Sequence, residues 1–273
     1  AQEALAPDAP QVPLESPTGQ GNLCEKIIVR YGEPDPILDK SPVLYQETFY
    51  TGRQEHAYLE PEAALAIPHP DGSVTIHYNG QSPFINQSHM TQVLGLPAEK
   101  VRIIQPVVGG SFGGKDDLGY QTSGQVAGLA LQAGRPVKLV LGREESMMAS
   151  YKREPMTIGF KLGTDAEGNL QAAKVEMLAD SGCFSSQSTL AMLRASLHAA
   201  GAYRYQAVHV DNLAVYTNNG FSGAFRGFGN TDAAAAIEQA IDDLAHQLGR
   251  DPLDFRLQNC VQQGDRFMSG NVV

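Results

Sequence analysis

Two kinds of hydrophobic spacing alternate along this chain, and together they predict both strands and helices. Runs rich in β-branched and aromatic residues predict strands at 43–51, 73–80, 100–108, 136–142, 155–163 and 170–180. The last two runs flank the segment TDAEGN, whose Asp-x-x-Gly-Asn pattern indicates a β-hairpin. We therefore expect at least one antiparallel pair in the second half of the chain.

Helical spacing appears in three stretches between these runs. A helix within 86–100 is expected to end near Gly95, and another over 120–134 shows one apolar face. The most regular pattern begins near Thr231 and is followed by Gly249 as a C-terminal cap. Asp251 then has the position of an N-cap for a last helix.

The mixture of hairpins and separate helices favours an α+β fold, with mixed or antiparallel sheets and packed helices, over a doubly wound parallel sheet. Residues 1–40 are dominated by proline and turn signals, so we expect a linker or a truncated preceding segment there. Residues 41–273 are expected to form one domain.

Composition narrows the class of protein. The chain has 273 residues with 42% hydrophobic and 18% charged residues, which is typical of a globular protein. The net charge of −10 argues against nucleic-acid and anionic-membrane partners, and no apolar run approaches the roughly 20 residues of a spanning helix. The N-terminus lacks the features of a signal peptide.

The chain has three cysteines, which are widely separated. Cys24, Cys183 and Cys260 form no C-x-x-C motif, which argues against a disulfide framework and against a zinc site. Such sparse cysteines favour a reducing, cytoplasmic location, with three ordinary buried thiols.

The glycine-rich segment at 107–117, VVGGSFGGKDD, allows three interpretations. The spacing from glycine to Lys115 fits a phosphate-binding loop, but Asp116 and Asp117 stand where such a loop needs a hydroxyl and positive charge. Ser111 lies within G-x-S-x-G, the turn that presents a nucleophilic serine, although further glycines extend the turn beyond that motif. The third interpretation is a bare glycine turn that allows close approach of a cofactor.

A second glycine segment, SGAFRGFGN at 222–230, also combines glycine with Phe225, Arg226 and Phe228. Two such bends could form a narrow slot for a flat molecule, with arginine near developing negative charge. We therefore expect the two bends to lie side by side. Structural turns with core phenylalanines remain the alternative.

Four motifs occur together in order over about residues 43–262: TGRQEHAYLEP, GGSFGGKD, AFRGFGN and DPLDFRLQN. In this combination the chain resembles the molybdenum hydroxylases, the xanthine dehydrogenase and aldehyde oxidase family. The resemblance covers the first molybdopterin-binding domain of the molybdenum-bearing part. It implies an oxidoreductase that hydroxylates an electron-poor C–H carbon with oxygen from water.

The resemblance also implies a set of residues around the cofactor. Gln54 matches the glutamine whose side-chain amide reaches a ligand of molybdenum, and Phe112 matches the residue whose backbone N–H approaches that centre. Arg226 matches an arginine that contacts the centre through its backbone. Gly110 and Gly113 complete the cofactor-binding set. For Gln54 an ordinary buried amide is the alternative.

Three residues match substrate-facing positions of the family. Arg194 and Asp116 stand at positions where charged residues favour a purine-like nitrogen heterocycle over an aldehyde, and Phe228 matches the ring that stacks on the substrate. Asp116 is one methylene shorter than the glutamate expected for purines. A surface helix arginine and an acid favoured at a helix N-terminus are the alternatives for Arg194 and Asp116.

The resemblance places further parts outside residues 1–273. These are the glutamate general base, the second molybdopterin-binding domain, and the iron–sulfur and FAD domains or subunits. We therefore expect a fragment of a larger enzyme that is inactive alone, lacks bound cofactor in isolation, and can self-associate. Its cofactor would be molybdenum-molybdopterin, with the cytosine dinucleotide form as one option. A non-catalytic assembly module of the same fold and a serine hydrolase using Ser111 are the alternative functions.

Overall fold

The structure, a computed structural model, describes residues 1–11, 18–116 and 119–273, which form two compact units. Unit 1 consists of Ala1–Arg53, Arg153–Ser222 and Gly227–Val273, whereas unit 2 consists of Gln54–Lys152 and Gly223–Arg226. The sequence of unit 2 is thus inserted into that of unit 1 at two places. The prediction of one molybdopterin-binding domain over residues 41–273 stays a prediction, since both compact units draw on that range.

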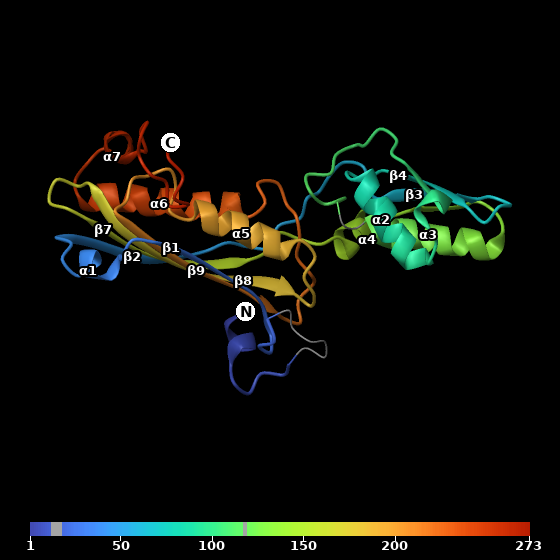
Figure 1. The fold of residues 1–273 in the computed structure, drawn as a ribbon, viewed down its shortest axis with the longest axis horizontal. Helices are drawn as coiled ribbons and strands as arrows, with labels where there is room; N and C mark the ends of the chain where they lie inside the picture. The colour runs from blue at the N-terminus through green and yellow to red at the C-terminus, as the bar shows by residue number, and fades with distance from the viewer. Residues whose placement is uncertain (12–17, 117–118) are drawn as a thin grey trace. The chain divides into compact units, whose positions relative to one another are not determined.

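A mixed five-stranded sheet, in the order β1-β9-β8-β7-β2, forms the frame of unit 1 (Figure 1). Its strands are β1 (Leu23–Tyr31), β2 (Val43–Tyr50), β7 (Met156–Thr164), β8 (Leu170–Gly182) and β9 (Ala207–Tyr216). Strands β8 and β9 run parallel, and the other neighbouring pairs run antiparallel. The predicted hairpin is confirmed, because β7 and β8 pair antiparallel on either side of the turn at 165–169.

The expectation that residues 1–40 are mostly linker and turns does not hold for Leu23–Tyr31. This segment is β1, and it pairs along its length with β9 at the edge of the sheet. Its side chains alternate between half-buried and exposed beyond Cys24, so charged residues interrupt the apolar pattern that normally indicates a strand. Strand β9 carries His209, Asp211 and Asn212 and likewise lies outside the predicted strands.

Two helices cover one face of this sheet, α5 (Ser188–His198) and α6 (Asn230–Gln247) (Figure 1). The predicted periodicity of α6 is confirmed, since Ile237, Ile241 and Leu244 are buried in the core that includes the inner side chains of β7 and β8. The short helix α1 (Asp35–Leu38) packs against the sheet through Leu38, which contacts Ala172 and Ala207. The sheet therefore has helices on both faces.

The last helix, α7 (Pro252–Asn259), begins where the sequence predicts. The side chain of Asp251 accepts hydrogen bonds from the backbone N–H groups of Leu253 and Asp254. These groups have no partner within the helix, so the carboxylate stabilises the first turn.

Unit 2 contains a four-stranded sheet in the order β5-β4-β3-β6. Its elements are β3 (Ala63–Pro68), β4 (Val74–Tyr78), α2 (Pro83–Leu94), β5 (Val101–Ile104), α3 (Gly119–Ala133), β6 (Val137–Val140) and α4 (Arg143–Ala149). Side chains of α2 and α3 pack with the sheet in one apolar core. The predicted end of α2 is confirmed, because Gly95 adopts a left-handed conformation with φ of 64°. Strand β3 lies outside the predicted strands, and β5 ends earlier than expected.

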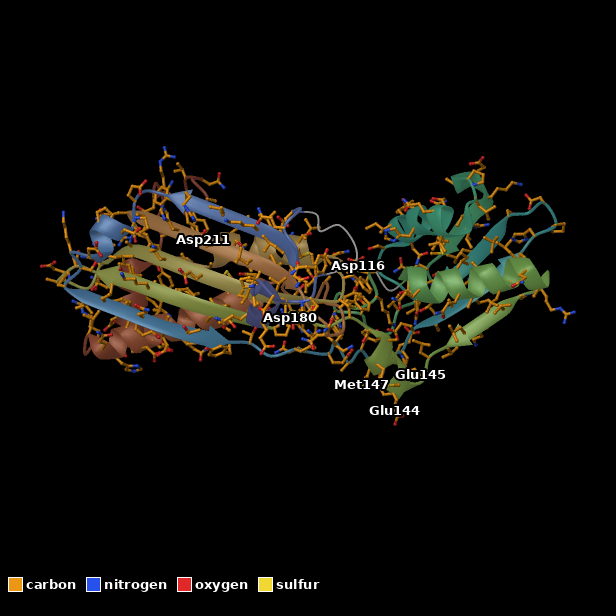
Figure 2. All side chains as sticks on the ribbon, turned by 90° about the horizontal axis from the view of Figure 1, so that it is seen from below. Asp116, Glu144, Glu145, Met147, Asp180 and Asp211 are labelled. Carbon is orange, nitrogen blue, oxygen red and sulfur yellow. The ribbon has the colours of Figure 1, made fainter. Side chains whose placement is uncertain are left out.

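Helix α4 carries two acidic residues in its first turn, Glu144 and Glu145 (Figure 2). The Glu145 carboxylate also accepts a hydrogen bond of 2.7 Å from the backbone N–H of Gly142. Acidic groups at this end of a helix interact favourably with its unpaired N–H groups. Two short 3-10 helices, Gln2–Leu5 in unit 1 and Ala98–Lys100 in unit 2, complete the described elements.

A cluster of charged side chains is buried in unit 1 beside α6. Arg153 and Asp232 form an ion pair of 2.9 Å, and both side chains are 5% exposed. The neighbouring Glu154 is also buried, and its Oε1 atom has no hydrogen-bond partner among the described residues. Burial raises the pKa of Glu154 to about 7, with the Asp232 carboxylate acting in the same direction and Arg153 opposing it. Burial likewise raises the pKa of Asp232, against the opposing effect of Arg153.

Replacing Glu154 with glutamine should therefore stabilise the protein at high pH. The pKa of Glu154 in the folded state lies above its ordinary value of 4.5. Between about pH 4.5 and about pH 7, Glu154 is therefore ionised in the unfolded chain but still protonated in the folded one, and the free energy of unfolding falls as the pH rises. Glu154→Gln removes this loss. We expect it to raise the free energy of unfolding by about 2–3 kcal/mol at pH 8, with little gain at pH 4.

Urea unfolding at both pH values measures this difference. Glu176→Gln, at an exposed position of β8, is the matched control and should change stability by less than about 0.5 kcal/mol at either pH. An equal effect of Glu154→Gln on the free energy of unfolding at pH 4 and pH 8 would contradict a raised pKa of Glu154.

Candidate functional site

The glycine-rich loop between β5 and α3 contains an unusual backbone conformation at a non-glycine residue. Phe112 has φ of 52°, between Gly110 at 95° and Gly113 at 97°. Bulky side chains rarely adopt positive φ, and the strain costs about 1–3 kcal/mol where they do. The described non-glycine residues with positive φ are Ala57, Phe112 and Phe228, so two of the three are phenylalanines of the predicted site.

The Glu60 carboxylate contacts both ends of this loop. Glu60 Oε2 accepts a hydrogen bond of 2.8 Å from the Gly109 N–H and lies 3.1 Å from Lys115 Nζ. The Lys115 side chain is 0% exposed, and burial lowers its pKa. Because the Lys115 ammonium group is buried against Glu60, it is not presented to a phosphate as a phosphate-binding loop requires. Asp117, also named for that interpretation, lies outside the described residues.

The other interpretation of this loop, a serine nucleophile, gains no support from the geometry. The Ser111 hydroxyl has no hydrogen-bond partner in the described part of the chain. A serine nucleophile requires an adjacent base and a third group that orients the base. Among the residues that the structure describes, neither lies within hydrogen-bond distance of the Ser111 hydroxyl.

The two glycine bends are in direct contact within unit 2. The Arg226 N–H donates a hydrogen bond of 2.9 Å to the Phe112 carbonyl oxygen. A Cβ atom on Gly113 would lie 2.6 Å from the Ala224 carbonyl oxygen, so only glycine allows this approach without displacement. The expectation that the bends near 110 and 226 lie side by side is therefore met.

A third segment, which begins at Gln54, reaches the same place. The His56 Nε2 atom lies 2.7 Å from the Ala224 carbonyl oxygen, and the His56 and Phe225 rings are 4.5 Å apart. Gln54 itself is exposed, so it is not the ordinary buried amide that was the alternative. Three segments of unit 2 thus meet: 54–60, 109–115 and 223–226.

Several backbone donors of the glycine loop remain unused. The N–H groups of Gly110, Ser111 and Phe112 have no hydrogen-bond partner among the residues that the structure describes. Consecutive amides in such conformations form a concave donor site for acceptor atoms. The Arg226 N–H, in contrast, is donated to Phe112, so a contact of that amide with a metal centre would require this hydrogen bond to open or to be shared.

The predicted substrate-facing acid, Asp116, lies at the end of this loop and is half-buried (Figure 2). Its carboxylate accepts a hydrogen bond from the Ser82 hydroxyl, and its backbone N–H donates to the Gly113 carbonyl oxygen at 3.4 Å. The carboxylate is therefore already oriented by a neighbouring side chain.

Arg194 and Phe228 are brought together within unit 1. The Arg194 guanidinium group lies 5.7 Å from the centre of the Phe228 ring, within range of a cation–π contact. Phe228 has φ of 54° and stands between two glycines that also have positive φ. Arg194 is exposed on α5, as the surface-arginine alternative expects, whereas Asp116 belongs to unit 2. The predicted joint role of Arg194 and Asp116 therefore remains a prediction.

Sequence reasoning missed the residues that hold the loop. Gln81 accepts the Gly113 N–H at 2.8 Å, and the Tyr151 hydroxyl donates to the Gly113 carbonyl. Glu60 lies within the motif TGRQEHAYLEP, and Lys115 within GGSFGGKD. The two motifs therefore contained both charged residues, but the sequence alone does not show that Glu60 and Lys115 pair.

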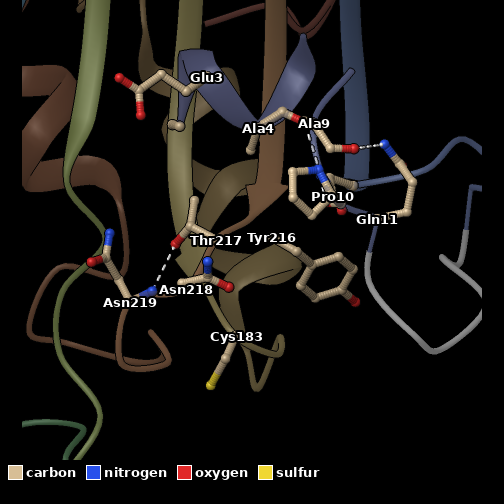
Figure 3. A pocket seen from close by; sticks show the side chains of 12 residues that line it. Glu3, Ala4, Ala9, Pro10, Gln11, Cys183, Tyr216, Thr217, Asn218 and Asn219 are labelled. Carbon is tan, nitrogen blue, oxygen red and sulfur yellow. Dashed lines mark hydrogen bonds between the residues drawn. The ribbon is translucent and has the colours of Figure 1, made fainter. Parts of the chain in front are cut away.

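The three cysteines and one cavity belong to unit 1. Cys24 is buried, but Cys183 is exposed and Cys260 is half-buried, so the prediction of three buried thiols is wrong for two of them; all three are free. Cys183 lines a cavity of about 600 Å³ in unit 1, together with polar side chains such as Asn218 and Asn219 (Figure 3). None of the predicted site residues lines this cavity.

Two features are absent from the described residues. No group of three or more His, Cys, Asp or Glu residues is placed to hold a metal ion. Within the same residues, no helix combines the length and the apolar character needed to cross a membrane.

Comparison with known proteins identifies relatives of the whole chain. The molybdopterin cofactor-binding domain family matches residues 16–260. The chain is 38% identical over 272 residues to the nicotinate dehydrogenase large molybdopterin subunit of Eubacterium barkeri, and the match covers 100% of this chain and 62% of that protein. It is 31% identical over 238 residues to the xanthine dehydrogenase of Emericella nidulans, covering 87% and 18%.

Solved structures show the same fold. The aldehyde oxidoreductase of Desulfovibrio gigas has a TM-score of 0.90 at 28% identity, and the match covers 98% of this chain and 29% of that one. Quinoline 2-oxidoreductase of Pseudomonas putida 86 has a TM-score of 0.90 at 25% identity, covering 100% and 35%. The chain thus spans less than two thirds of the length of each of these proteins.

The matched family, the identities to these relatives and the shared fold agree with the four motifs in the sequence. This chain belongs to the molybdopterin cofactor-binding domain family, in the group of the xanthine dehydrogenase and aldehyde oxidase type.

Proposed function

We propose that this chain is the part of a molybdenum hydroxylase that presents backbone amides to a molybdenum-molybdopterin cofactor. The whole enzyme would hydroxylate a C–H carbon of a purine-like nitrogen heterocycle, with water as the oxygen source. One observation carries this proposal: the strained Phe112 lies in a bend that is hydrogen-bonded to the Arg226 bend. Strain of this kind is retained where the surrounding structure imposes it, often at a functional site.

The donor groups present fit such a cofactor. Gly110, Ser111 and Phe112 offer backbone N–H groups, and Gln54 offers an exposed side-chain amide. Amides donate hydrogen bonds to oxygen and sulfur atoms, so they suit a metal centre that is held by its own organic ligand. When bound, the cofactor supplies the oxygen-transfer and redox chemistry. The chain's residues would orient it and exclude water around it.

The substrate roles rest on three side chains. Phe228 would hold the plane of a flat heterocycle, and Arg194 would stabilise negative charge that develops on the ring. Asp116 would share a proton with a ring nitrogen, in an orientation set by Ser82. The names of two relatives, a nicotinate dehydrogenase subunit and a xanthine dehydrogenase, support a nitrogen heterocycle over an aldehyde.

The remaining parts of the enzyme would come from elsewhere. We propose that they include a second molybdopterin-binding domain with the general base, and iron–sulfur and FAD domains or subunits. Large apolar side chains are strongly exposed in unit 2, including Leu59 at 91% and Val107 at 94%, which supports contact with a partner or self-association. The cytosine dinucleotide form of the cofactor and a cytoplasmic location complete the proposal.

Molybdenum analysis of the full-length enzyme tests the function. One molybdenum per active unit supports hydroxylation, whereas a protein that carries no molybdenum would be the non-catalytic assembly module.

Gly113→Ala should reduce cofactor binding in the full-length enzyme. The added methyl group would meet the Ala224 carbonyl at 2.6 Å, and φ of 97° is unfavourable for alanine, so the two bends must separate. We expect the molybdenum content per polypeptide to fall at least about threefold, which corresponds to roughly 0.7 kcal/mol. The matched control is Gly128→Ala in α3, where the new methyl group meets nothing within 4 Å. Equal molybdenum contents in the two variants would contradict the role of the bend contact.

Arg194→Met should impair turnover of a purine-like substrate far more than that of an aldehyde. Removing a cation that stabilises transition-state charge costs about 2–4 kcal/mol, so we expect kcat/KM for the heterocycle to fall roughly 30-fold or more. The control is Arg266→Met, another exposed arginine of unit 1. Steady-state kinetics with both substrates measures the effect, and equal losses for heterocycle and aldehyde would rule out the assigned role.

A further inference from the structure

The loop that carries Phe112 is closed by a single ion pair at its base. Gly109 and Lys115 are six positions apart, yet both donate to the same atom, Glu60 Oε2, at 2.8 and 3.1 Å. The backbone repeats the connection, since the Glu60 N–H donates to the Gly109 carbonyl at 3.1 Å. The carboxylate therefore determines the separation of the loop ends.

The Lys115 side chain of this pair is buried. It is 0% exposed, its ammonium group lies 4.7 Å from the centre of the Tyr58 ring, and Glu60 supplies the opposite charge. Burying an unpaired ammonium group is costly, and the Glu60 carboxylate, with Glu62 acting in the same direction, offsets this cost for Lys115. The Glu60 side chain is 39% exposed, and the contacts with Gly109 and Lys115 lower its pKa although partial burial opposes this.

Both ends of the loop approach their neighbours closely enough that only glycine fits there. A Cβ atom on Gly109 would lie 2.6 Å from Glu60 Cβ, and one on Gly114 would lie 2.6 Å from the Tyr58 ring. Tyr58 is itself buried and donates its hydroxyl hydrogen to Glu62. The Lys115 ammonium group of the ion pair thus packs against the buried Tyr58 ring.

Between these fixed ends lie the strained Phe112 and the unused amides of Gly110, Ser111 and Phe112. A strained loop relaxes unless its ends are held, and relaxation would rotate these N–H groups away from a common direction. We propose that Glu60 and Lys115 are a positioning pair that holds the amides of Gly110–Phe112 in the geometry that receives the cofactor. This inference rests on the proposed function of the loop, and neither side chain is assigned a contact with substrate or cofactor.

The test uses the full-length enzyme with three variants. Glu60→Gln keeps the shape and an acceptor for Gly109 but removes the charge that Lys115 needs. Lys115→Met removes the ammonium group and keeps an apolar stem beside Tyr58. The matched control is Asp71→Asn, which breaks a Lys–Asp pair of 3.0 Å in the same unit whose side chains, Lys100 and Asp71, are 34% and 63% exposed.

Hydrogen–deuterium exchange of the peptide 106–116 is the first readout, because it reports loop opening without requiring cofactor. We expect exchange about tenfold faster in Glu60→Gln than in Asp71→Asn, while the rest of unit 2 exchanges as in the wild type. Lys115→Met should behave in the same way, and if it fails to fold, Glu60→Gln alone decides. Unchanged exchange in Glu60→Gln overturns the proposal.

Molybdenum content and kinetics of the same preparations separate positioning from plain stability. We expect Glu60→Gln to lower the molybdenum content and kcat per molybdenum by roughly tenfold, with KM changed by less than about threefold. Faster exchange with molybdenum content and kcat equal to those of Asp71→Asn would mean that the pair is structural only, and the proposal fails. A wild-type enzyme that binds no molybdenum would refute the proposed function, whereas the exchange readout would still show whether the pair holds the loop.

Discussion

The hydrogen bond from the Arg226 N–H to the Phe112 carbonyl joins two bends that are more than a hundred residues apart in the sequence. It forms only because Gly113 lacks a side chain where it meets Ala224, and because Phe112 accepts a left-handed backbone. Everything assigned to the candidate site within unit 2 depends on this contact. The unused amides belong to the same loop, and the Gln54 segment reaches the second bend through His56.

Neighbouring residues offset the unfavourable free energy of the left-handed Phe112 and the buried Lys115. A left-handed phenylalanine and a buried lysine are both unfavourable when considered alone. Each is offset by a specific neighbour: Gln81 and Tyr151 bind Gly113, and Glu60 pairs with Lys115. Unit 1 also contains a buried ion pair close in sequence to Phe228. Arg153 pairs with Asp232 at the start of α6 and also contacts Thr231.

Much of the fold could be predicted from local patterns. The hairpin of β7 and β8, the periodicity of α6 and the cap at Asp251 each follow from signals within a few residues. Strands β1 and β9 were missed because charged and polar residues interrupt their apolar alternation, and their pairing joins segments about 180 residues apart. The motifs identified the bends and the family. The ionic contacts of Lys115 could not be predicted, because its sequence neighbours suggest a phosphate ligand and only the fold reveals its burial.

The division of the sequence between the units has a consequence for synthesis on the ribosome. Residues 54–152 carry all the strands of the smaller sheet, so that sheet can assemble soon after this segment emerges. The last four residues of unit 2, 223–226, are synthesised only after β9, which is the last strand of the larger sheet. Domains usually fold as units during translation, but here unit 2 is not complete until residue 226 has been made, and unit 1 also draws on residues after it. The contact between the two bends can therefore form only after residue 226 has been made, and a nascent chain released before that point would lack it.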